Sequence, residues 1–99
     1  SKIDELWFDL AVLYAEKLEK YDRAIYYFKE LKSKYPKSKY SALAAYNTAY
    51  LIETELKNYS EAEINYLQFL NDYPNETQVK TVFDRLLKLQ LAFVTWISL

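Results

Sequence analysis

Four amino acids are missing from this 99-residue sequence: cysteine, glycine, histidine and methionine. Without cysteine the chain can form no disulfide, no thiolate metal site and no thiol nucleophile. Without histidine, carboxylate pairs are left without the usual partner for acid–base catalysis. About seven glycines would be expected at this length, so glycine-rich phosphate loops are excluded and the turns must suit ordinary residues. We therefore predict no enzyme activity, no metal and no cofactor.

Net charge is also nearly absent, at −1 from 13 basic and 14 acidic residues. No overall field draws such a chain toward nucleic acid or an anionic membrane. One local run, KELKSKYPKSKY at 29–40, interleaves lysines with two tyrosines, a pattern that can track a phosphate backbone and stack bases. Lysines in a last helical turn also complement the helix dipole. We favour this second interpretation and expect no nucleic-acid partner.

The sequence has only two prolines, Pro36 and Pro74, and each follows a tyrosine. They lie 38 residues apart, and many other residues match at the same offset: Ala11 with Ala49, Leu13 with Leu51, Tyr21 with Tyr59, Ala24 with Ala62, Phe28 with Tyr66 and Leu31 with Phe69. A period between about 20 and 50 residues marks an architecture in which units stack on each other. We predict a single domain, 1–99, with repeats at about 3–38 and 39–76 and a half repeat at 77–99.

Apolar residues recur three and four positions apart, and no stretch alternates as a strand would. The pattern predicts an all-α fold with five helices, at about 3–18, 23–34, 39–56, 61–72 and 77 to near the end. Each proline disfavours a helical conformation at the tyrosine before it and so ends a helix. We expect Asp22 and Ser38 to cap helices, and Ser60 to form a capping box with Glu63.

Alanines stand where paired helices would have to approach closely: Ala11 and Ala24 in the first unit, Ala49 and Ala62 in the second. Together with the aromatic residues beside them and the closing prolines, they resemble the tetratricopeptide repeat. This resemblance implies a right-handed superhelix of antiparallel helix pairs, about two and a half repeats long. The chain departs from the family in its 38-residue period, longer than the usual one, and in Ile52, which stands where an aromatic is expected.

Long units that end in tyrosine–proline are typical of bacterial envelope members of this family, such as the barrel-assembly lipoprotein and the Tol–Pal coordinator. The resemblance therefore favours the periplasm or cell envelope of a bacterium over the cytoplasm. Because the sequence begins at Ser1 without methionine, we also expect a processed chain or an excised fragment.

The resemblance further implies a non-catalytic scaffold that binds a peptide or partner helix on a concave face lined by the first helix of each pair. By register with the family, thirteen residues line this groove. Eight of them are predicted to bind the partner: Phe8, Val12, Leu43, Tyr46, Asn47, Tyr50, Glu53 and Arg85. The other five are Glu5, Asp9, Glu16, Asp84 and Lys88. Aromatic residues are common interface anchors. The alternative is that some of these side chains are buried against neighbouring helices.

The last fourteen residues, LLKLQLAFVTWISL, contain ten apolar residues and one charge. We expect one helix face, with Val79, Val82, Phe83 and Leu86, to cover the preceding helix pair. The other apolar residues of this helix would have no cover within one molecule. We therefore predict that the isolated chain self-associates through four of them: Leu91, Val94, Trp96 and Leu99. The uncharged run spans only 11 residues, whereas a membrane span takes about 20, so we expect no membrane contact. Self-assembly is thus the alternative to peptide binding as the function.

Overall fold

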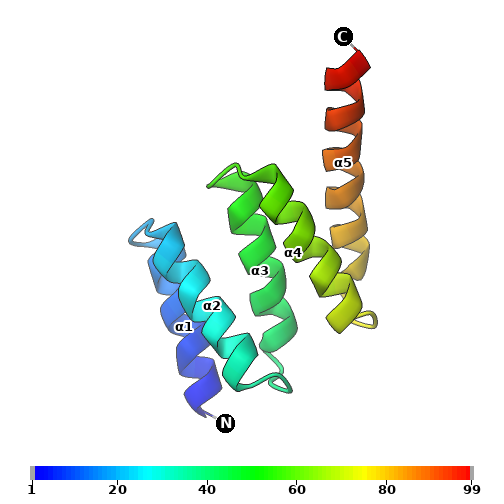
Figure 1. Cartoon of the computed structure of the whole chain (residues 1–99). Coiled ribbons are helices and arrows are strands. Elements are labelled where there is room, and N and C mark those ends of the chain that lie inside the picture. The colour runs from blue at the N-terminus through cyan, green and yellow to red at the C-terminus, as the bar shows by residue number, and fades with distance from the viewer. Residues whose placement is uncertain (1, 99) are drawn as a thin grey trace.

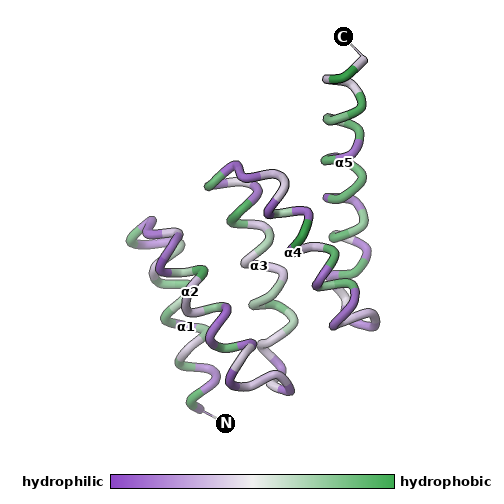
Figure 2. Tube along the Cα trace, in the orientation of Figure 1, coloured by the Kyte–Doolittle hydropathy of each residue, from purple (hydrophilic) through white to green (hydrophobic). Residues whose placement is uncertain are grey.

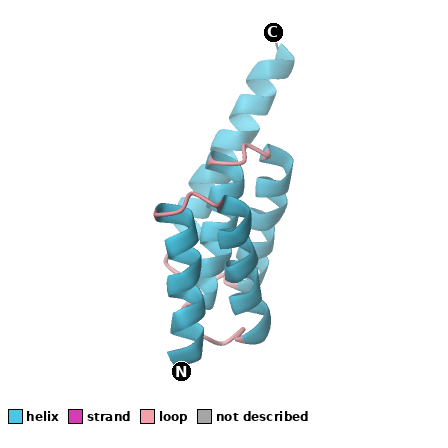
Figure 3. Ribbon diagram, turned by 90° about the vertical axis from the view of Figure 1, so that its left-hand side faces the viewer, coloured by secondary structure: helices cyan, strands magenta, loops and turns pink. Residues whose placement is uncertain are grey.

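The computed structural model describes residues 2–98, which form five α-helices and no strand. The helices are α1 (Lys2–Glu16), α2 (Tyr21–Lys34), α3 (Ser41–Thr54), α4 (Tyr59–Asp72) and α5 (Val79–Ser98). Consecutive helices pack on each other, and the two ends of the chain lie at opposite ends of the molecule (Figure 1). Turned by 90°, α1 and α3 form one layer and α2 and α4 the other (Figure 3). The predicted all-α repeat fold is confirmed.

The two prolines end their helices as predicted. Tyr35 and Tyr73 leave the helical conformation, and their N–H groups donate to the carbonyls of Leu31 and Phe69 at 2.9 and 2.8 Å. The carbonyl of each tyrosine then accepts a hydrogen bond from the backbone three residues later. The two units therefore use the same turn.

The turns inside the two helix pairs do not match the expectation of ordinary backbone geometry. Glu19 and Lys57, which lie 38 residues apart, both have positive φ, 51° and 55°. This left-handed conformation costs a non-glycine residue roughly 1–2 kcal/mol. The N–H of the next residue then donates to a carbonyl six residues back, at Tyr14 in the first unit and Ile52 in the second. The absence of glycine therefore did not exclude left-handed turns.

Helix capping differs from the prediction. Helix α4 begins at Tyr59 because the Asn58 side chain accepts a hydrogen bond from the N–H of Glu61 at 3.2 Å. Ser60 thus lies inside the helix, and the predicted capping box is wrong. Asp22 likewise lies inside α2, whose N-cap, Lys20, makes no side-chain bond. Ser38 accepts from the N–H of Tyr40 at 3.1 Å, in the turn just before α3.

The four alanines lie where the helices touch. Ala11, Ala24, Ala49 and Ala62 are all fully buried, as predicted for close helix approach. Large aromatic side chains fill the space beside them: Phe28, Tyr66 and Phe69. A methyl side chain lets two backbones approach closely, and the aromatic side chains occupy the space that remains beside it.

Helix α5 contacts the rest of the molecule mainly with its first half, and Leu89 and Gln90 extend these contacts only slightly further. Val82 is buried, and Val79 and Leu86 are partly buried against the core of α3 and α4. Phe83, which we expected on this covered face, is 58% exposed. It lies about 100° around the helix from Val82, so it faces away from α4. The second half of α5 projects beyond the other helices (Figure 1), and hydrophobic residues recur along its length (Figure 2).

Candidate interaction surfaces

A groove of about 300 Å³ lies between α1 and α3 and reaches the start of α2. Its lining residues are Val12, Ala15, Glu16, Tyr21, Phe28, Asn47, Tyr50, Leu51 and Glu55. We call it the α1–α3 groove. The structure thus brings together three of the residues predicted to bind a partner, namely Val12, Asn47 and Tyr50. Sequence reasoning missed Tyr21 and Glu55, because they stand at helix ends outside the family's groove positions.

Two of the predicted groove aromatics pack against the core instead of facing a free surface. Phe8 stacks on Tyr40, with ring centroids 5.2 Å apart, and meets the edge of Phe28 at 5.6 Å. Tyr46 packs against the core formed by α3 and α4. Leu43 is partly buried and is not part of the α1–α3 groove. Phe8 and Tyr46 thus follow the alternative interpretation, in which some of these side chains are buried against neighbouring helices.

Tyr50 differs from these residues because it is 39% exposed. Its ring stacks on Tyr46 with centroids 5.8 Å apart and an interplanar angle of 28°. The Arg85 guanidinium lies 5.3 Å from the Tyr50 ring centroid. These two contacts hold the exposed ring in place at the edge of the groove.

Glu53, predicted to line the groove, is buried and joins three helices. Its carboxylate accepts hydrogen bonds from the Tyr66 hydroxyl at 2.7 Å and from Arg85 Nε and Nη2 at 2.9 and 2.6 Å. Burial, followed by the bond to Glu53, raises the pKa of Tyr66, so this phenol stays a donor. The Glu53–Arg85 pair therefore fixes α5 to α3 and is not available to a ligand.

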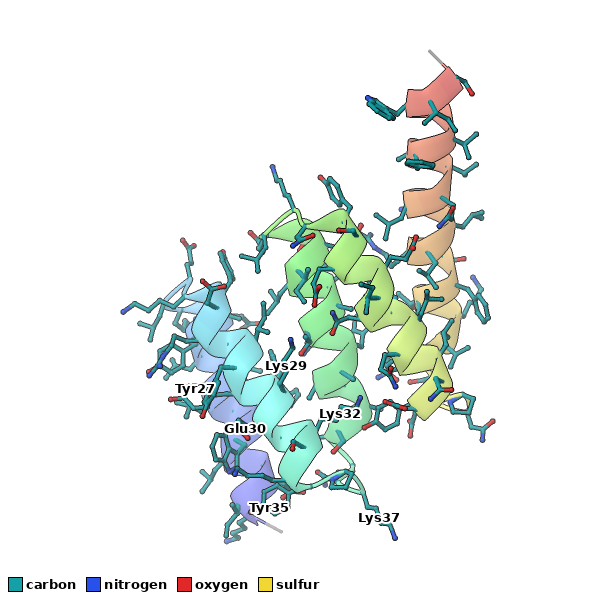
Figure 4. The ribbon with its side chains drawn as sticks, in the orientation of Figure 1. Tyr27, Lys29, Glu30, Lys32, Tyr35 and Lys37 are labelled. Carbon is teal, nitrogen blue, oxygen red and sulfur yellow. The ribbon has the colours of Figure 1, made fainter. Side chains whose placement is uncertain are left out.

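The lysine-rich segment at 29–40 does not present a continuous basic surface. Lys32 pairs with Asp72 at 2.5 Å, and Lys34 lies 3.8 Å from Glu30. The bond from Lys32 lowers the pKa of Asp72. In Figure 4, Lys37 points away from the helices, whereas Lys32 points toward α4. Two of the five lysines are thus engaged with carboxylates.

A cleft of about 720 Å³ separates the first turns of α4 from the second half of α5. Gln90 donates across it to Glu63 at 2.6 Å. Glu63 and Gln90 are the equivalents, 38 positions later, of Ile25 and Ile52. Both isoleucines belong to one buried apolar cluster. A polar pair thus replaces an apolar contact, and α5 diverges from α4 beyond this point.

The residues predicted to mediate self-association lie on this divergent part of α5. Leu91, Val94 and Trp96 are each at least half exposed. Leu99 lies outside the described residues. The exposed apolar surface extends to further residues on the same helix: Phe83, Leu87, Phe93 and Ile97.

Metal binding and membrane insertion are two further possibilities for residues 2–98. No group of three or more carboxylates is placed to hold a metal ion in this part of the chain. None of the described helices has the length and apolar character needed to cross a membrane.

Comparison with known proteins gives one match. Residues 5–38 fit the family model of the tetratricopeptide repeat, and this segment corresponds to the first predicted unit. No curated protein and no solved structure matches the chain. The match does not separate bacterial envelope members from the rest of the family. This segment is therefore similar to the tetratricopeptide repeat, and the five stacked helices and the backbone hydrogen bonds that recur after 38 residues agree with that likeness.

Proposed function

We propose that this chain is a non-catalytic interaction module that binds a peptide or a partner helix on the face formed by α1 and α3. Tetratricopeptide repeats generally mediate protein–protein interaction, and the match at residues 5–38 supports this general role. The observation that carries the proposal is the α1–α3 groove, which combines an apolar floor with the exposed ring of Tyr50. The envelope location stays a prediction from resemblance.

Tyr50 suits the role of an anchor because its ring is exposed to solvent and is also fixed by contacts with neighbouring side chains. Aromatic residues near the centre of an interface commonly contribute 2 kcal/mol or more to binding. An anchor that is already fixed loses little conformational entropy on binding. Stacking on Tyr46 and the Arg85 cation restrict the ring before a ligand arrives.

The experiment uses a labelled peptide selected from a displayed library against the wild-type chain. Tyr50→Ala should weaken its binding by about 2 kcal/mol, or roughly thirtyfold, with the helical signal preserved. Tyr26→Ala is the matched control, because Tyr26 is 51% exposed on α2, in the opposite layer. Equal losses from both variants, or no loss from either, would count against this face.

Self-assembly through α5 is a second candidate, and it is favoured by a specific observation. Ala11 and Ala49 are fully buried under the helix that follows each of them, whereas Leu87, at the equivalent position in α5, is 59% exposed. Seven large apolar side chains of α5 are at least half exposed. At about 100 Å² each they offer roughly 700 Å², close to the 800 Å² per partner of a standard interface.

A second copy can cover this surface, since a two-fold pair hides the same patch on both molecules. Light scattering across a range of concentrations should therefore give a mass above 11.9 kDa for the wild-type chain. Replacing Leu91, Val94 and Trp96 with glutamine should restore the monomer. Ile64→Gln with Leu67→Gln, at exposed sites on α4, should leave the mass unchanged. A wild-type monomer at high concentration would rule this candidate out.

A further inference from the structure

The α1–α3 groove combines an apolar floor with a rim of a single charge sign. Val12, Ala15 and Leu51 contribute apolar surface, and the charged residues in the lining are Glu16 and Glu55. No lysine or arginine lines it. We propose that this groove receives a lysine or arginine side chain, so that the partner segment is basic. The inference rests on the proposed function, because it names the chemistry of the ligand for the same face.

Neither carboxylate is neutralised by a cation within the described chain, although Glu55 interacts with the Tyr21 hydroxyl, whose pKa is raised by burial and then by this carboxylate. Glu16 and Glu55 are exposed and form no ion pair with any residue in 2–98. Other acidic residues do pair with cations: Glu30 with Lys34, Glu53 with Arg85, Asp72 with Lys32 and Asp84 with Lys80. The groove therefore carries an uncompensated negative charge, which favours a cationic partner and disfavours an acidic one.

The guanidinium of Arg85 lies over the Tyr50 ring at the edge of this lining. It makes two hydrogen bonds to the Glu53 carboxylate, so its charge is balanced locally. It therefore does not replace the missing partner of Glu16 or Glu55.

The shape of the groove also suits a long basic side chain. Lysine and arginine pack their methylene stems along apolar surface while the charged group stays in water. Here the stem would contact Val12, Ala15 and Leu51, and the cation would reach the carboxylates at the rim. Tyr21 adds an aromatic ring to the lining, and aromatic rings attract cations over their faces. A groove of about 300 Å³ is at the small end of ligand sites, as expected for one side chain.

Three short peptides of otherwise identical sequence test the proposal, with lysine, glutamine or glutamate at their polar positions. Fluorescence anisotropy should show the lysine peptide binding about tenfold more tightly than the glutamine peptide, and the glutamate peptide more weakly than both. Added salt should reduce this preference, because exposed charges are screened. The double variant Glu16→Gln with Glu55→Gln should remove the preference for lysine over glutamine.

Asp22→Asn with Glu76→Gln is the matched control, because it removes the same charge from exposed sites outside the groove. This control should keep most of the preference for lysine. If the glutamine or glutamate peptide bound as tightly as the lysine peptide, or if both double variants acted alike, the basic-ligand inference would be overturned and the proposed function would stand. If no peptide bound, or if Tyr50→Ala bound all three as the wild type does, both would fail.

Discussion

A single carboxylate, Glu53, connects three helices near the centre of the molecule. It accepts hydrogen bonds from Tyr66 of α4 and from Arg85 of α5 while belonging to α3 itself. Removing one member of a buried ion pair leaves the other charge without a partner, which usually costs more than removing both. Buried polar residues such as Glu53 help to attach α5, because the apolar contacts of this helix are confined to residues 79–89.

Arg85→Met should therefore lower the free energy of unfolding by about 3 kcal/mol. The value lies at the low end of the range for buried pairs because the Arg85 side chain is 23% exposed. Adding Glu53→Gln should recover part of the loss, since the unpaired charge is then gone. Urea unfolding of both single variants and the double variant measures this coupling. Purely additive losses would show that the pair does not act as a unit.

The ion pair between Lys32 and Asp72 should make stability depend on pH. The bond from Lys32 lowers the pKa of Asp72 below its ordinary value of 3.8, so the unfolded chain binds a proton more readily than the folded one. The stabilisation is complete above the unfolded pKa and is lost as the pH falls through the folded pKa. Asp72→Asn should be less stable by about 0.5 kcal/mol above pH ~5, because both side chains are partly exposed.

Unfolding of Asp72→Asn and the wild type, followed over a pH series, should converge near pH ~2. Glu76→Gln, which removes an exposed carboxylate four residues away, is the control and should match the wild type throughout. A difference that persists at low pH would mean that the asparagine disturbs packing or hydrogen bonds, not charge.

The spacing between paired helices is set by their alanines and by the aromatic residues that lie between them. Ala24 and Ala62 occupy equivalent positions in α2 and α4, and both are fully buried. Fixed spacing at these contacts explains why the two turns between paired helices share the same backbone hydrogen bonds. The distance between two paired helices should therefore change only when the residues at their contact are changed.

Ala24→Leu and Ala62→Leu should each destabilise the chain by roughly 1–3 kcal/mol, because extra atoms in a full interface force the helices apart. Ala92→Leu, on the exposed part of α5, is the matched control and should cost less than about 0.5 kcal/mol. Thermal unfolding of the three variants provides the comparison. Equal melting temperatures would contradict the helix register described above.

The whole molecule is elongated, with extents of 50 × 31 × 17 Å, and most of its contacts are between helices that follow each other in the chain. In such an arrangement stability varies along the chain, because each element depends on the one beside it. From residue 90 to residue 98, all side chains of α5 are exposed. It is therefore the part of the described chain with the least tertiary support.

Hydrogen exchange of dilute protein should show fast exchange for the amides of residues 91–97 and slow exchange for those of Ala49, Ile52 and Tyr66. Raising the concentration should slow exchange in 91–97 alone if a second copy covers α5. Amides of α3 serve as the internal reference, since their protection should not change. Slow exchange throughout α5 in dilute monomer would show that this helix is stable without cover.

Local signals predicted much of this protein. Helical spacing gave five helices, and the prolines marked two of their ends, because proline restricts the residue before it wherever it occurs. The 38-residue offset located the buried alanines, since equivalent positions in stacked units face equivalent neighbours. Helix caps were less predictable. Asn58 and Ser60 are both residues that commonly cap a helix, and only the backbone conformation in the structure shows which of them does so.

The tertiary structure alone decided which side chains remain free. The sequence placed Phe8, Tyr46 and Tyr50 on one face, but contacts from Tyr40, Tyr66 and Phe69 cover the first two more than the third. Tyr21 and Glu55 reached the groove from helix ends that no periodicity connects. Helical spacing determines which residues share a face, because that geometry is local. Whether the face is covered depends on helices distant in sequence, whose approach no local pattern encodes.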